Sequence, residues 1–185
     1  MYYPNAVPGL HKMFISQIGS IVCTVLLLIP VVNFFALIGV YGFLILSLVG
    51  LNEAGRDIEG CKTAFYITIV QIVLNVLSYF LGTGVLDVAI SIVLCILNFL
   101  TVYYVCSSVA EALRSRSFGD IAARGELVWK INLAYYIAEI LRLVLTCIPV
   151  LNVLIVPVIQ LIVTIVSLVG GILYIMFLYK SYVSL

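Results

Sequence analysis

The sequence predicts an all-α integral membrane protein, with six transmembrane helices arranged as three helical hairpins. Its 185 residues are 65% hydrophobic and 9% charged, with a mean hydropathy of +1.31. Soluble domains have about 45–50% apolar and about 25% charged residues, so the surplus apolar surface of this chain must face lipid. The apolar segments are close to the roughly 20 residues that cross a bilayer, and polar links or turn residues separate them.

The first hairpin follows from the uncharged run Met13–Asn52, which is about twice as long as one span needs. Pro30 and Asn33 divide this run, because proline breaks a helix interior and asparagine tolerates turn geometry. We therefore expect a tight turn at Ile29–Asn33. The two expected spans are Leu10–Ile29 and Phe34–Leu51.

The second hairpin lies between two polar links, at about residues 52–60 and 111–126. Its spans are expected at Thr63–Leu81 and from Val85 to about Glu111, because the two glycines of Gly82–Gly84 mark a turn. Asp87 then falls in the first turn of the fourth span, where a carboxylate meets the positive end of the helix dipole. Both this capping role and a role in proton or solute transfer are open for Asp87.

The third hairpin begins in the second polar link. Ser117, with Asp120 three residues later, is expected to cap a short interfacial helix that leads into the fifth span. That span should end near Cys147. A second turn sequence, Ile148–Asn152, repeats the pattern of the first turn, and the sixth span should run from about Val153 to Tyr179.

The three hairpins, at about residues 9–51, 61–113 and 125–180, share sequence features that predict an internal triplication. A Ser-Leu-Val-Gly sequence follows the first and the last turn, at Ser47–Gly50 and Ser167–Gly170. Gln71 and Glu139 occupy matching places, about nine residues after the lysine that opens their hairpins. Each hairpin opens with a glycine and then a lysine: Gly9 and Lys12, Gly60 and Lys62, Gly125 and Lys130.

The distribution of basic residues predicts the orientation in the membrane. Eight of the nine Lys and Arg residues lie at the chain ends, in the two links or beside them, whereas the three expected turns carry no charge. The positive-inside rule makes the charged face cytoplasmic, with both termini on that side of a cell membrane. These eight residues are Lys12, Arg56, Lys62, Arg114, Arg116, Arg124, Lys130 and Lys180.

Glu139 and Arg142 are the ionisable residues placed well inside an expected span, and with Gln71 they form the candidate polar site. Charges at mid-membrane are costly and face a bundle interior or water. Their spacing of three puts them on one helix face, where they can pair. Two readings are open: an internal salt bridge that fixes one helix against its neighbours, or a polar site shared with Gln71 and with Tyr135 or Tyr136. Asn75, Asn98, Asn132 and Gln160 are expected to serve as packing hydrogen-bond groups.

No catalytic residue, cofactor site or metal site is expected. The sequence contains no HExxH motif, no phosphate-binding glycine loop and no GxSxG, and its one histidine, His11, falls at a membrane edge. The five cysteines form no CxxC motif, which predicts free, mostly buried thiols. A net charge of +1 gives no basic footprint for nucleic acid.

The turn and link at Ile29–Lys62 resemble those of small, uncharacterised multi-spanning membrane proteins of bacteria, over about residues 9–70. Size and span number are also similar to the substrate-binding subunits of energy-coupling-factor vitamin transporters, although the bare outer turns differ from the loops that close over a vitamin. Two functions follow as hypotheses. The first is a non-enzymatic accessory, assembly or regulatory module that contacts lipid and other membrane proteins or itself. The second is a small transporter or channel centred on Gln71, Glu139 and Arg142.

Overall fold

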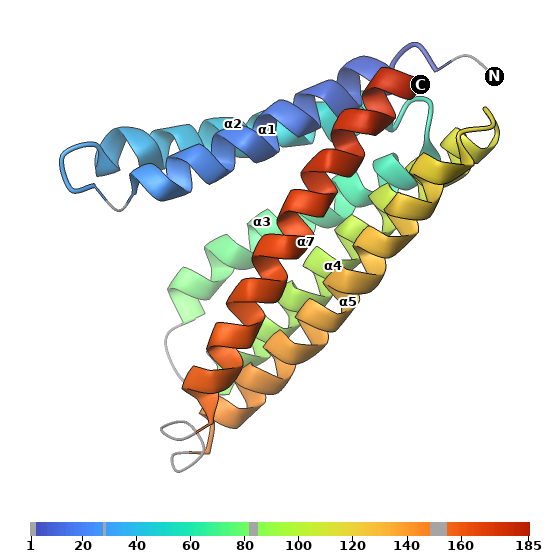
Figure 1. Cartoon of the computed structure of the whole chain (residues 1–185). Coiled ribbons are helices and arrows are strands. Elements are labelled where there is room, and N and C mark those ends of the chain that lie inside the picture. The colour runs from blue at the N-terminus through green and yellow to red at the C-terminus, as the bar shows by residue number, and fades with distance from the viewer. Residues whose placement is uncertain (1–2, 28, 82–84, 149–154) are drawn as a thin grey trace.

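The computed structural model describes residues 3–27, 29–81, 85–148 and 155–185, and these segments form a bundle of long helices (Figure 1). The described helices are α1 (Ala6–Leu26), α2 (Asn33–Ala54), α3 (Glu59–Leu81), α4 (Val85–Arg114), α5 (Gly119–Thr146) and α7 (Val156–Ser184). All of them except α5 are long and apolar enough to cross a membrane. Helix α5 has 28 residues but carries Lys130, Glu139 and Arg142 along its length. The prediction of an all-α membrane protein is confirmed.

The element bounds agree closely with the expected hairpins. The first turn falls between Leu26 and Asn33 and includes Pro30, as the sequence predicts, while Leu28 lies outside the described residues. Pro157 lies in the first turn of α7, where the absence of its N–H is tolerated. The expected turn at residues 82–84 lies outside the described part of the chain. So does the expected turn at Ile148–Asn152, except for Ile148.

The six described helices form a closed ring. Each of them packs against the next described helix along the chain, and α7 returns to pack against α1. The α1–α2 hairpin meets the other helices at the end of the bundle that holds both chain termini, and it separates from them toward its own turn (Figure 1). At the shared end, Arg116 donates a hydrogen bond to the main-chain oxygen of Leu185 and lies 5.4 Å from the centre of the Tyr3 ring. The two termini and the α4–α5 link are therefore held together there.

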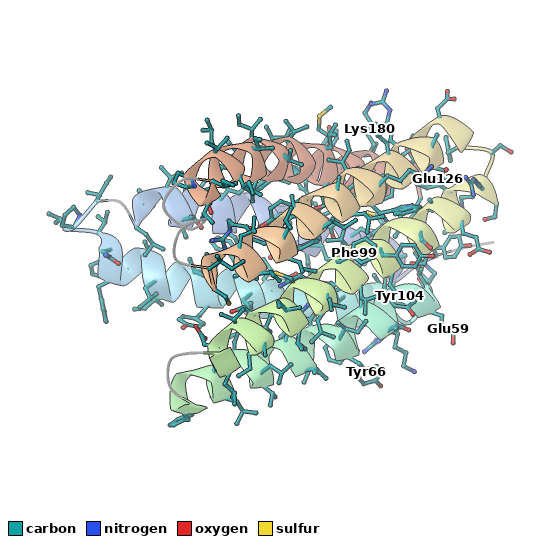
Figure 2. The ribbon with its side chains drawn as sticks, turned by 90° about the horizontal axis from the view of Figure 1, so that it is seen from below. Glu59, Tyr66, Phe99, Tyr104, Glu126 and Lys180 are labelled. Atoms are coloured by element: carbon teal, nitrogen blue, oxygen red, sulfur yellow. The ribbon has the colours of Figure 1, made fainter. Side chains whose placement is uncertain are left out.

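Two of the three ion pairs of the described residues lie at this same end. Lys12 pairs with Glu53 between α1 and α2, and Arg114 pairs with Glu126 between α4 and α5. Figure 2 shows Glu59 and Glu126 toward this end, with Phe99 farther along α4. We call it the charged end of the bundle.

The buried core also lies near the charged end. All six helices contribute to it, and each contributes residues from the half that is closer to the links. Toward the turns the apolar side chains are instead open to the surroundings, as at Val31 (87% exposed) and Phe80 (82% exposed). Such surfaces are what lipid covers. The largest fully buried side chains are Phe177, Leu10, Met13, Leu51, Leu113, Leu178, Val105, Val109 and Val128.

The opening glycine of each hairpin permits a close approach of two helices. A Cβ at Gly9 would lie 2.6 Å from the Gly50 oxygen in α2, and one at Gly60 would lie 2.9 Å from the Tyr104 oxygen in α4. A Cβ at Gly125 would lie 2.7 Å from the Phe177 ring in α7. Gly9 and Gly60 therefore face the main chain of the second helix of their own hairpin, whereas Gly125 faces the Phe177 ring and the Cys106 oxygen of α4. A common origin of the three hairpins stays a prediction.

The expected cap at Ser117 is wrong. Helix α5 begins at Gly119, its N-cap residue is Phe118, and no side chain caps it. Ser117 instead has a φ of 68° and ends α4, because its N–H bonds the Arg114 oxygen and the Phe118 N–H bonds the Leu113 oxygen. This is the Schellman arrangement, in which a left-handed residue satisfies the last carbonyls of a helix. Glycine usually takes that position, so the serine concealed the helix end in the sequence.

A helix cap that the sequence did not predict lies at Asp57. Its carboxylate accepts hydrogen bonds from the main-chain N–H groups of Asn5 (2.6 Å) and Ala6 (2.9 Å) and from the Asn5 side chain (2.9 Å). The α2–α3 link thereby caps α1 from 52 residues away in sequence. Burial alone would raise the pKa of Asp57, but the hydrogen bonds outweigh it and hold the pKa below its ordinary value of 3.8.

We expect Asp57→Ala to destabilise the protein by about 1 kcal/mol, the usual effect of losing a helix cap. The pKa of Asp57 is lower in the folded protein than in the unfolded chain. Its contribution to the free energy of unfolding is therefore fully present above the unfolded pKa of about 3.9, and it is lost as the pH falls through the folded-state pKa. The midpoint of thermal unfolding should therefore differ between wild type and variant at pH 7 and converge in acid. Glu111→Ala, which removes an exposed carboxylate of the same end, is the control. A constant difference down to acid pH would contradict the assignment.

Candidate functional site

A cavity of about 380 Å³ lies inside the ring, and all six helices line it. Its volume is within the range of about 300–1,000 Å³ that is typical of small-molecule sites. The lining is unusually polar for a membrane interior, where each polar group needs a partner. The lining residues with polar side chains are Gln17, Ser47, Thr68, Gln71, Asn98, Thr101, Asn132, Tyr135, Tyr136, Ser167 and Tyr174. We call this space the central cavity.

The buried core separates the central cavity from the charged end. In α3, the core residues Cys61 and Ala64 precede the cavity residues Thr68 and Gln71. The same order, core first and cavity second when counted from the charged end, holds in the other five helices. Gln71 lies 12 residues into α3, which is about 18 Å along the helix axis. The cavity is therefore closed toward the charged end by a layer of packed apolar side chains.

The far side of the central cavity is not enclosed in the same way. Asn98 and Ser167 both line it and are both exposed. They belong to α4 and α7, whereas the α1–α2 hairpin separates from the rest of the bundle toward the turns (Figure 1). The cavity is consequently open to the surroundings at Asn98 and Ser167.

One side-chain hydrogen bond joins two helices at the cavity wall. Gln71 is buried, with 7% of its surface exposed, and its Nε2 donates a hydrogen bond to Thr101 Oγ1 at 3.2 Å. The Thr101 hydroxyl itself donates to the Leu97 oxygen at 3.1 Å, one helical turn back. Because that hydroxyl proton is used, Thr101 must accept from the Gln71 amide, which fixes the amide orientation. The Gln71 carbonyl oxygen is then the group that faces away from this bond.

Two asparagines of the lining are oriented in a similar way. Asn98 donates from Nδ2 to the Leu94 oxygen, and Asn132 donates from Nδ2 to the Val128 oxygen, both at 2.9 Å. A main-chain carbonyl can only accept, so the amide nitrogen must be the group that faces it. Each asparagine thereby keeps its carbonyl oxygen and one amide N–H for other partners.

Tyrosines form the aromatic part of the cavity wall. The rings of Tyr135 and Tyr136 have centres 4.7 Å apart, and Phe99 of α4 lies 6.2 Å from Tyr136. Tyr174 of α7 is buried among core and cavity residues. Phenol groups combine an apolar ring with one hydroxyl, which suits a wall that must be both packed and polar.

Glu139 and Arg142 form a two-point ion pair within α5. Arg142 donates from Nε to Glu139 Oε2 at 2.9 Å and from Nη2 to Oε1 at 2.5 Å. The Glu139 side chain is 15% exposed and the Arg142 side chain is 21% exposed. The pairing expected from their spacing of three is therefore confirmed.

Of the residues of the candidate polar site, only Gln71 lines the central cavity. Glu139 and Arg142 are not among the lining residues. Glu139 lies one turn beyond Tyr135 on α5, and its carboxylate turns to Arg142 of its own helix. Asn75 and Gln160, which were expected to aid packing, lie outside the cavity too, and each forms its side-chain bond within its own helix. A functional role for the Glu139–Arg142 pair remains a prediction.

Several cavity residues were not singled out from the sequence, namely Gln17, Thr68, Thr101 and Tyr174. Ser47 and Ser167 were named only as parts of the repeated Ser-Leu-Val-Gly sequence. A usable signal was present, because Thr68 with Gln71 and Asn98 with Thr101 form polar pairs at a spacing of three, on one face of an otherwise apolar helix. Serine and threonine also bond to their own helix in membranes, so single residues carried little information.

A second, more open cavity of about 560 Å³ lies at the charged end between the α2–α3 link and α4. Asp57, Glu59 and Glu111 contribute to its lining. The Asp57 carboxylate is already occupied by the cap of α1. Within the described residues, no group of three or more His, Cys, Asp or Glu side chains is placed to hold a metal ion, and all five cysteines are free thiols.

The central cavity is thus an uncharged polar site inside a membrane-spanning ring, closed at one end and lined by every helix of the described chain. No protein-family model matches the chain, and no curated protein or solved structure matches it.

Proposed function

We propose that this protein is a small transporter or solute-binding protein of the membrane, and that its central cavity binds an uncharged polar molecule. The observation that carries the proposal is the convergence of polar side chains from all six helices on one cavity. Polar groups are costly inside a membrane. A purely structural bundle could fill the same space with apolar side chains, which would be more stable there.

The charge of the lining supports an uncharged ligand. The described residues around the cavity include no Asp, Glu, Lys or Arg, and Glu139 and Arg142 of α5 pair with one another. An ion without a counter-charge would have to give up its hydration in this site at a large free-energy cost. Amides, hydroxyls and aromatic rings instead suit a neutral solute that is both polar and compact.

The proposal includes an orientation. The basic residues of the links and chain ends favour a cytoplasmic position for the charged end, with both termini inside the cell. The central cavity would then open toward the outside, and the packed core would separate it from the cytoplasm. Movement of the α1–α2 hairpin relative to the other helices would be needed to pass a solute inward, as in alternating access.

Solute flux into proteoliposomes tests this function. We expect purified protein to accelerate the entry of one or more small neutral solutes over protein-free vesicles, and we expect Gln71→Leu to reduce that rate about 10-fold. The reduction reflects the loss of a hydrogen bond that a buried polar site makes to its ligand. Gln160→Leu is the matched control, because it removes an amide of α7 that lies outside the cavity.

Two outcomes would contradict the proposal. One is a flux equal to that of empty vesicles, together with the absence of binding for every solute in a broad panel. The other is an equal loss for Gln71→Leu and Gln160→Leu, which would assign the effect to the general stability of the protein. Either result would favour the other hypothesis, a non-enzymatic accessory or assembly module that acts through protein contacts in the membrane.

A further inference from the structure

We propose that an anionic phospholipid binds in a groove between α5 and α7 at the charged end. Its phosphate lies against Arg124 and Lys180, and one hydrocarbon chain lies along the apolar wall of the groove. Basic pockets between membrane-spanning helices bind anionic lipid headgroups in this way. The groove is separate from the central cavity, and the inference does not depend on the proposed function.

The groove has a volume of about 180 Å³, and every residue of its lining except Arg124 is apolar. Val128 and Phe177 are buried and form its floor, whereas Leu127 and Met176 are about half exposed and form its walls. The volume is below the range of about 300–1,000 Å³ that is typical of sites for whole small molecules. It suits a segment of a hydrocarbon chain.

Two cations lie at the rim of the groove that faces the charged end. Arg124 belongs to the lining, and Lys180 follows the lining residue Met176 by one helical turn on α7. The two helices meet at this level, because a Cβ at Gly125, next to Arg124, would lie 2.7 Å from the Phe177 ring. Figure 2 shows Lys180 on α7 toward the charged end. The groove therefore combines an apolar wall with a basic rim.

The depth of the two cations matches that of lipid headgroups. Helices α5 and α7 have 28 and 29 residues, which is about 42–44 Å, and a bilayer with its headgroups is about 40–45 Å thick. Arg124 lies five residues after Gly119 and Lys180 lies four residues before Ser184, which places them about 6–8 Å from these helix ends. They consequently lie near the boundary between headgroups and hydrocarbon, with the apolar wall on the hydrocarbon side.

Neither cation forms an ion pair within the described residues. Asp120, one turn before Arg124 on α5, is not paired with it, and Glu126 is already paired with Arg114. A phosphate group can supply the missing negative charge, because its oxygens accept two parallel N–H bonds from a guanidinium. This charge complementarity favours an anionic phospholipid over a zwitterionic one.

Lipid binding to the purified protein in detergent, followed by native mass spectrometry, tests the inference. We expect dioleoyl phosphatidylglycerol to bind about 10-fold more tightly than dioleoyl phosphatidylcholine, which has the same chains and no net charge. Glycerol phosphate carries the anionic group without the chains, and it should bind at least 10-fold more weakly than phosphatidylglycerol. These comparisons use the wild-type chain and do not depend on the folding of a variant.

A pair of double variants locates the site. Arg124→Gln with Lys180→Gln should reduce the preference for phosphatidylglycerol over phosphatidylcholine to within about two-fold. Arg56→Gln with Lys62→Gln is the matched control, because it also removes one arginine and one lysine of the charged end, both exposed and both outside the groove. The control should keep the preference of the wild type.

Three results would overturn the inference. Equal affinities for the two lipids would show that the cations do not select an anionic headgroup. Glycerol phosphate binding as tightly as phosphatidylglycerol would show that the groove holds no lipid chain. An equal loss of preference in both double variants would assign it to the overall charge of this end. None of these results bears on solute flux, so the proposed function is tested separately.

Discussion

Replacing Glu139 or Arg142 alone by leucine is expected to destabilise the protein by about 3–5 kcal/mol, the usual cost of breaking a buried ion pair. The two side chains are joined by two hydrogen bonds and are largely shielded. Glu139→Leu leaves a guanidinium that cannot lose its proton, and Arg142→Leu leaves a carboxylate that must take one up or remain charged. Either variant therefore strands a polar group within α5.

The double variant Glu139→Leu, Arg142→Leu is expected to be nearer to wild type than either single variant. Two leucines replace a paired charge by apolar groups of similar size, which is often neutral or stabilising. The midpoint of thermal unfolding in detergent and the amount of protein in membranes both measure this. Asn75→Leu is the control, because that amide bonds only the main chain of its own helix. Additive losses in the double variant would show that the two residues do not act as a pair.

Gly9→Ala is expected to destabilise the protein by about 2–3 kcal/mol, because overpacking forces the backbone to move. An added Cβ at Gly9 would lie 2.5 Å from the Ala54 nitrogen and 2.6 Å from the Gly50 oxygen, and both are main-chain atoms of α2 that cannot turn aside. This contact holds the α1–α2 hairpin together at the charged end, beside the Lys12–Glu53 pair. The same measurement of thermal unfolding applies.

Gly42→Ala provides a matched control in the same hairpin. A Cβ at Gly42 would meet no atom within 4 Å. Alanine is favoured over glycine in a helix interior by about 1 kcal/mol, so this change should be neutral or stabilising. The two substitutions are chemically identical, yet Gly9→Ala should destabilise the protein and Gly42→Ala should not. Equal effects would show that the close approach of α1 and α2 at Gly9 does not contribute to stability.

The architecture was largely predictable because membrane spans obey strong constraints. Length and apolar composition predicted the helices, and Pro30 predicted the first turn. The end of α4 was less predictable, because Ser117 adopts a left-handed conformation that glycine usually marks. The cap of α1 was also missed, since Asp57 is distant in sequence and only the folded α2–α3 link brings it to Asn5 and Ala6.

The candidate site was predicted in part. Gln71 was singled out correctly as a residue of the bundle interior, and the pairing of Glu139 with Arg142 followed from their spacing. Charge made Glu139 the most conspicuous residue of α5, yet its own partner satisfies it, and the cavity is lined by neutral groups. Which amides and hydroxyls meet in space depends on the rotation of each helix, and an apolar sequence specifies that rotation weakly.

The most direct test of the central cavity is to determine from which face of the membrane it can be reached. In a variant that carries Ser47→Cys, Cys95→Ser and Cys147→Ser, we expect a small, membrane-impermeant thiol reagent to modify Cys at position 47 from the side opposite the charged end. Cys61 and Cys106, both fully buried in the core layer, should remain unmodified from either side. Modification of position 47 from the cytoplasmic side, or from neither side, would contradict an outward-opening polar cavity that the packed core closes toward the cytoplasm.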